Sequence, residues 1–165
     1  MYLYLEYKLS NIVRGGIIYC GGDTIAALIL GEFTLIRMLT MLVVGSTIYA
    51  FEIPNYFRWI DKKTLTLSGL KKAQAKTGLA LLYFNPLWVA RHLFFIKVSM
   101  LQWNEIAVIS LINIGFYSFL VNIPIAVIAN YLIQNQVNLK WRFLASAIFS
   151  ALMAIYYAMS AVWFS

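Results

Sequence analysis

The chain has 165 residues, of which 62% are hydrophobic and 12% are charged, with a net charge of +7 and a mean hydropathy of +0.78. A soluble domain has roughly twice this share of charged residues, so the composition excludes a soluble fold and predicts one membrane-embedded, all-α domain over residues 1–165. One histidine and one cysteine exclude an intrachain disulfide and metal sites built from several imidazoles or thiolates.

Five apolar segments are long enough to cross a bilayer as helices. About 20 residues are needed, because a helix rises ~1.5 Å per residue and the apolar layer is ~30 Å thick. We therefore predict a polytopic transmembrane helical bundle. Its spans are residues 9–31, 34–60, 77–98, 105–134 and 141–163.

The first span combines small residues with one acid. Gly15, Tyr19, Gly22 and Ala26 fall on one helical face, and small residues let another backbone approach closely in lipid. Asp23 lies well inside the span and needs a polar partner, because a charge in the membrane costs ~2.5 to 3.5 kcal/mol. It is either a hydrogen-bonding anchor or a ligand for an ion or substrate.

The second and third spans carry further charges and flank a polar stretch. Glu52 lies near the exit of the second span, and Arg91 and His92 lie inside the third. Arg91 keeps its charge and needs a partner, whereas His92 is either a neutral hydrogen-bonded residue or a titrating one. The stretch 61–76 is predicted to be a basic loop that either marks the retained side of the membrane or binds anionic lipid headgroups. Its lysines are Lys62, Lys63, Lys71, Lys72 and Lys76.

The fourth span, residues 105–134, has one charge at its first position and three polar amides inside. Pro124 has no amide proton and its ring crowds the carbonyl of Leu120, which predicts a kink near the centre. Asn122 and Asn130 need hydrogen-bond partners on neighbouring helices. We therefore expect this span to be the central helix of the bundle.

The fifth span has a seam of alanines at spacings of four, three, four and three residues. This pattern is typical of close helix packing, either within the bundle or against other subunits or copies of the chain. The seam consists of Ala147, Ala151, Ala154, Ala158 and Ala161.

Charge distribution and depth give the expected orientation and two expected ion pairs. Five spans place ten of the thirteen basic residues on the side of the amino terminus, so the positive-inside rule predicts the amino terminus inside and the carboxyl terminus outside. Orientation thus explains the positive charge, and we expect no nucleic-acid partner. Similar depths predict that Asp23 pairs with Arg91 and that Glu52 pairs with Arg14.

Several short motifs lie in a characteristic order along the chain. Gly22 and Asp23 form a Gly-Asp pair in the first span, Arg37 begins the second, and Pro124 precedes Asn130 in the fourth. This order resembles the Mpv family of small membrane proteins (Mpv seventeen and the twenty-two-kilodalton peroxisomal membrane protein). Further matching positions are Gly45, Tyr56, Phe57, Ile60, Asp61, Leu70, Lys71, Lys72, Tyr131 and Arg142, whereas Ile123 stands where the family has tryptophan.

The resemblance implies a protein of the mitochondrial inner membrane, the peroxisome or a related membrane that forms a weakly selective channel for ions or small metabolites. It implies no enzymatic activity, and we expect no cofactor. A bacterial membrane stays open as an alternative. The residues expected to form a polar pathway, or to act as interhelical anchors, are Asp23, Arg37, Glu52, Arg91, His92, Asn122, Pro124 and Asn130.

Two other functions compete with a channel. An intramembrane enzyme would need clustered acids, a nucleophile with a base, or several histidines, and the six acids lie at least nine residues apart. A structural or accessory subunit of a larger membrane complex, packing through its glycine and alanine faces, is consistent with the whole sequence. We expect no enzyme, and we keep the structural role as the alternative to transport.

Overall fold

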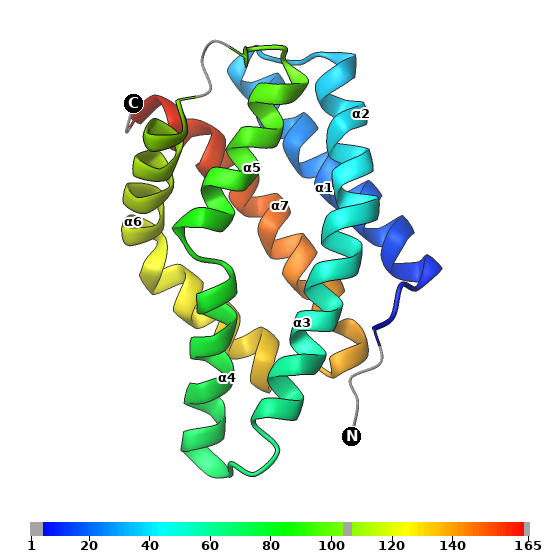
Figure 1. Cartoon of the computed structure of the whole chain (residues 1–165), viewed down its shortest axis with the longest axis vertical. Coiled ribbons are helices and arrows are strands. Elements are labelled where there is room, and N and C mark those ends of the chain that lie inside the picture. The colour runs from blue at the N-terminus through cyan, green and yellow to red at the C-terminus, as the bar shows by residue number, and fades with distance from the viewer. Residues whose placement is uncertain (1–4, 104–106, 164–165) are drawn as a thin grey trace.

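The computed structural model describes residues 5–103 and 107–163, with side chains through Tyr156. Every regular element in this part of the chain is a helix (Figure 1). The elements are α1 (Leu9–Leu30), α2 (Leu35–Val44), the π-helix η1 (Gly45–Tyr49), α3 (Ala50–Lys63), α4 (Gly69–Tyr83), α5 (Pro86–Ser99), α6 (Val108–Asn135) and α7 (Leu139–Trp163).

These elements form five helical rods that are long and apolar enough to cross a membrane. α2, η1 and α3 join into one rod, α4 and α5 form another, and α1, α6 and α7 each form one. The rods alternate in direction, so that α1 begins at one end of the bundle and α7 ends at the other (Figure 1). The predicted fold, a multi-pass helical membrane bundle, is confirmed.

The surface is rich in large apolar side chains. Val43, Val121, Ile128 and Leu152 are among the residues that are exposed around the rods. A soluble monomer rarely leaves such a continuous apolar surface in water. This exposure therefore fits a bundle whose outer surface faces hydrocarbon.

The third rod differs from its prediction in two ways. α4 begins at Gly69, so the stretch predicted as a basic loop is mostly helix and only residues 64–68 connect α3 to α4. Lysine, glutamine and alanine favour helix, which explains why this polar stretch is helical.

The rod is also broken after Phe84, because Pro86 starts α5 and disfavours a helical conformation at Asn85. The Asn85 side chain caps α5 by accepting hydrogen bonds from Leu87 N (2.8 Å) and Trp88 N (3.2 Å).

The packing faces of α1 and α7 meet inside the chain. A Cβ atom added to Gly22 would lie 2.7 Å from Ala151 Cα, so the two backbones touch. Ala26 and Ala154 pack together farther along the same contact. These alanines of the seam are therefore used within the bundle. The side chains of Ala158 and Ala161 lie outside the described residues.

α6 contains the expected proline but does not occupy the expected central position. The helix changes direction about halfway along (Figure 1), which agrees with the kink predicted at Pro124. It packs against α4, α5 and α7, whereas α7 contacts α1, α3, α5 and α6. The small residues of α7 allow closer approach on several sides, and large apolar side chains cover the outer face of α6.

Candidate functional site

Irregular segments of three rods come together in the middle of the bundle. Tyr49 closes the π-helix of the second rod, and its ring lies 5.5 Å from that of Trp88, just after the break in the third rod. Trp88 in turn lines a cavity with Asn122 and Ala126, which flank Pro124 in the fourth rod. Interrupted helices of this kind line binding sites at the midplane of many transporters.

Glu52 and Arg91 form an ion pair beside this point. Arg91 Nη1 donates to both carboxylate oxygens of Glu52, at 2.9 and 3.2 Å, and the Tyr83 hydroxyl donates to the same carboxylate at 2.8 Å. The guanidinium of Arg91 also lies over the ring of Tyr49, 5.6 Å from its centre. About a third of each charged side chain is exposed, 36% for Glu52 and 33% for Arg91.

A second ion pair joins α1 to α2 near the turn between them. The guanidinium of Arg37 donates from Nε and Nη2 to the two carboxylate oxygens of Asp23, both at 2.9 Å. Each of these side chains is only 1% exposed. Arg37 Nη1 also donates to Glu32 at 2.9 Å, so one arginine neutralises a buried and a half-exposed acid.

Both ion pairs predicted from depth are therefore wrong. Asp23 pairs with Arg37 rather than Arg91, and Glu52 pairs with Arg91 rather than Arg14. Depth does not specify a partner, because residues of several helices share each level. The short turn after α1 brings the start of α2 back alongside α1. The long side chain of Arg37 then reaches Asp23.

His92 is buried and hydrogen-bonded. Its Nδ1 lies 3.1 Å from the Tyr49 hydroxyl, and its ring stacks on Trp88 with the two planes 9° apart. His92 follows Arg91 in the sequence. Its ring lies within a cluster of aromatic side chains that includes Tyr49 and Trp88.

α6 carries a row of polar residues that faces the bundle interior. We call this row the polar face of α6. Its five members are spaced four residues apart, all are buried, and four of them are polar: Ser118, Asn122, Ala126, Asn130 and Gln134. At the helical rise the row is ~24 Å long, which covers most of the apolar layer.

Several polar atoms of this face have no hydrogen-bond partner in the described part of the chain. They are Ser118 Oγ, Asn122 Oδ1 and both side-chain polar atoms of Gln134. Asn130 Nδ2 donates back to the carbonyl of Ala126 at 2.9 Å. Since most buried polar groups are hydrogen-bonded, this row is an exception that needs a physical explanation.

The middle of the polar face borders a small cavity. Asn122 and Asn130 line it together with Ser146 and Ser150 of α7, and its volume of about 10 Å³ holds on the order of one water molecule. Trp88 forms one wall. The same indole also lines a more open pocket of about 220 Å³ beside Tyr83 and Arg91, so it separates the interior cavity from that pocket.

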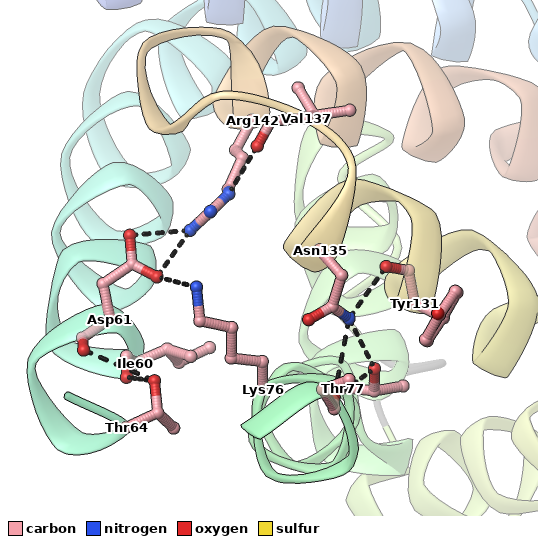
Figure 2. Close-up of polar contacts among 10 residues, drawn as sticks. Ile60, Asp61, Thr64, Lys76, Thr77, Tyr131, Asn135, Val137 and Arg142 are labelled. Carbon is pink, nitrogen blue, oxygen red and sulfur yellow. Dashed lines mark hydrogen bonds and ion pairs between the residues drawn. The ribbon is translucent and has the colours of Figure 1, made fainter. Parts of the chain in front are cut away.

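A third charged cluster lies at the end of the bundle where the turns at 64–68 and 136–138 are found. We call this end of the bundle the basic end. Arg142 Nη1 donates to both oxygens of Asp61 at 2.8 Å, and Lys76 binds the same carboxylate (Figure 2). Asn135 Nδ2 contacts Thr77 Oγ1 at 3.3 Å (Figure 2). Lys76 is buried in this cluster, so it differs from the other lysines predicted to meet lipid headgroups.

Ser118 and Gln134 are not among the residues predicted from the sequence, and neither are the partners Tyr49 and Tyr83. The four-residue spacing from Ser118 to Gln134 is visible in the sequence and could have identified the polar face. The tyrosines gave no such signal, because aromatic residues are frequent throughout the apolar segments.

Comparisons with protein-family models, curated proteins and solved structures found no match. Within the described residues, no group of three or more histidine, cysteine, aspartate or glutamate side chains is arranged to hold a metal ion.

Proposed function

We propose that this chain is a small multi-pass membrane protein that lets small ions or polar metabolites pass with weak selectivity, as the resemblance to the Mpv family implies. The polar face of α6 supports this proposal best. Leaving a buried polar group unpaired costs ~1 to 3 kcal/mol, so a bundle with a purely structural role would gain from apolar residues at these positions. Water and passing solutes would supply the missing partners.

Flux through liposomes tests this proposal. The purified chain is reconstituted, and osmotic swelling is recorded in salts and polyols of increasing size. Wild-type protein should speed the entry of small solutes, and N122L/N130L should reduce that entry while retaining the fold, because it removes polar groups from the pathway. The matched control is V121L/I128L, which changes two residues on the exposed face of the same helix.

Trp88 provides a second readout of the same pathway. Trp88→Phe keeps an aromatic ring but removes part of the wall between the cavity and the pocket beside Arg91. Faster entry of small solutes is expected. Wild-type flux equal to that of protein-free liposomes would contradict the proposed transport function.

A structural or accessory role is the second candidate, and the close packing of the interior favours it. The backbones of Gly15 and Gly45 touch, as do those of Gly22 and Ala151, and the cavity beside Asn122 is no larger than a water molecule. The native mass of the particle in mild detergent separates the two roles. A particle containing other membrane subunits, together with no flux, would favour the accessory role.

We further infer that the basic end faces the inside, which places the amino terminus inside and the carboxyl terminus outside, and that the host membrane is the mitochondrial inner membrane. The positive-inside rule supports the orientation, and the family resemblance supports the membrane. Protease protection of tags at the two termini tests the orientation, since the two tags should be cleaved from opposite sides.

A further inference from the structure

A groove on the surface of the basic end carries unbalanced positive charge. It lies between the residues that precede α1, the middle of α3 and the start of α7, and its volume is about 660 Å³. Lys8, Arg14, Arg58 and Lys140 line it together with one acid, Glu6. Four positive charges against one negative charge leave a net charge of +3 in this groove.

One wall of the groove is fixed by hydrogen bonds to the helices. Glu6 N donates to Asn55 Oδ1 at 2.9 Å, and Asn55 Nδ2 donates back to the carbonyl of Glu6 at 2.9 Å. The Tyr7 hydroxyl donates to the carbonyl of Ser46 at 2.6 Å. Asn55 is buried, so these bonds attach the segment before α1 to the second rod and hold the groove in shape.

The charges in the groove are only partly neutralised. Lys8 Nζ lies 2.8 Å and Arg58 Nη1 3.0 Å from the carboxylate of Glu6, and the hydrogen bond from Lys8 lowers the pKa of Glu6, which is therefore ionised at neutral pH. Arg14 and Lys140 form no ion pair in the described part of the chain. Their charges lie 4.8 and 5.8 Å from the ring centre of Trp141. A cation over an aromatic face keeps N–H donors available for a ligand.

Apolar side chains continue the groove away from its charges. Pro54, Leu139 and Phe143 line it, and Leu9 and Val13 are exposed at the start of α1. Trp141 lies in the first turn of α7, at the start of the last rod, where aromatic residues commonly mark the boundary between headgroups and hydrocarbon. A ligand that matches this arrangement has an anionic headgroup and hydrocarbon chains.

We propose that this groove binds the phosphate diester of an anionic membrane phospholipid. Arg14 and Lys140 contact the phosphate, Lys8 and Arg58 supply the remaining positive potential, and the acyl chains lie along the apolar residues. Charge-assisted hydrogen bonds from guanidinium and ammonium groups to phosphate are strong, and basic pockets between membrane helices bind lipid headgroups in this way. The site is separate from the lysines of α3 and α4.

Native mass spectrometry of the full chain in mild detergent tests the proposal. The protein is titrated with dioleoyl phosphatidylglycerol, which is anionic, and with dioleoyl phosphatidylcholine, which has no net charge. Wild-type protein should retain phosphatidylglycerol in preference to phosphatidylcholine. R14Q/K140Q should weaken phosphatidylglycerol binding by about tenfold or more, since each basic residue contributes ~1 kcal/mol to anionic-lipid attraction.

Two matched variants and a competitor make the result specific. R14K/K140R keeps both charges and should retain binding, as should K97Q, which removes a charge at the end of α5, outside the groove. Thermal unfolding verifies that each variant is folded. Equal binding of the two lipids, or equal loss in K97Q and R14Q/K140Q, would overturn the proposal. Release of the lipid by a few millimolar inorganic phosphate would also overturn it, because the groove would then be a site for a free anion.

Discussion

At the scale of single residues, the charges inside the bundle are held by specific partners. Each acid of the described part forms an ion pair, and the pair of Asp23 and Arg37 is the most deeply buried of these. A buried pair of this kind contributes little net stability compared with apolar residues of similar size. Removing one partner, however, leaves an uncompensated charge and costs ~3 to 5 kcal/mol.

A double-mutant cycle on Asp23 and Arg37 should therefore show strong coupling. D23N and R37Q should each lower the unfolding temperature in mild detergent, and D23N/R37Q should lose much less than the sum of the two single losses. The same cycle on Asp23 and Arg91 should show almost no coupling, because these residues belong to different pairs. Strong coupling between Asp23 and Arg91 would contradict the observed pairing.

Asn85 allows a second test at this scale. Its side chain accepts two backbone N–H groups at the start of α5, so Asn85→Ala should destabilise the protein by ~1 kcal/mol. Ser68→Ala is the matched control, because Ser68 occupies the same capping position before α4 but its side chain makes no capping hydrogen bond. The measurement is chemical or thermal unfolding in detergent, and equal losses in the two variants would show that the cap at Asn85 adds nothing.

At the scale of helices, close contact between backbones determines which rods meet. The α1–α7 contact depends on Gly22, where any side chain would collide with Ala151. Gly21, one residue earlier, has no atom within 4 Å of an added Cβ and lies away from this contact. Two adjacent glycines in one helix thus have opposite roles.

Substitutions at these two glycines should separate their roles. Gly22→Val should force α1 and α7 apart and lower stability by ~1 to 3 kcal/mol or more. Gly21→Val should leave stability almost unchanged, since its side chain meets open space. Unfolding temperatures in the same detergent compare the two, and a similar loss at Gly21 would mean that α1 is rotated from its observed position.

At the scale of the whole molecule, local patterns predicted the spans but not their contacts. Hydropathy identified five spans, and small-residue spacing identified the packing face of α1, because both signals lie within one helix. The partners of Asp23 and Glu52 depend on how different rods are placed, which no single segment specifies. The polarity of the stretch 61–76 predicts a loop, but lysine, glutamine and alanine also favour helix, and most of this stretch is helical.

The bundle encloses several polar groups in a largely apolar interior and also exposes large apolar side chains on its outside, which a soluble protein keeps mostly buried. The polar face of α6 turns toward α4, α5 and α7, while its outer face carries Val121, Ile125 and Ile128. The proposed pathway depends on this orientation, because only the inner face would meet water during transport.

Cysteine accessibility along α6 tests this claim most directly. With Cys20 replaced by alanine, single cysteines are introduced at positions 118, 121, 122, 125, 128, 130 and 134 of the reconstituted protein and exposed to a small, charged, water-soluble thiol reagent. We expect the cysteines that replace Ser118, Asn122, Asn130 and Gln134 to react, and those that replace Val121, Ile125 and Ile128 to be protected. Equal protection at every position, or reaction only on the outer face, would contradict a water-accessible pathway along α6.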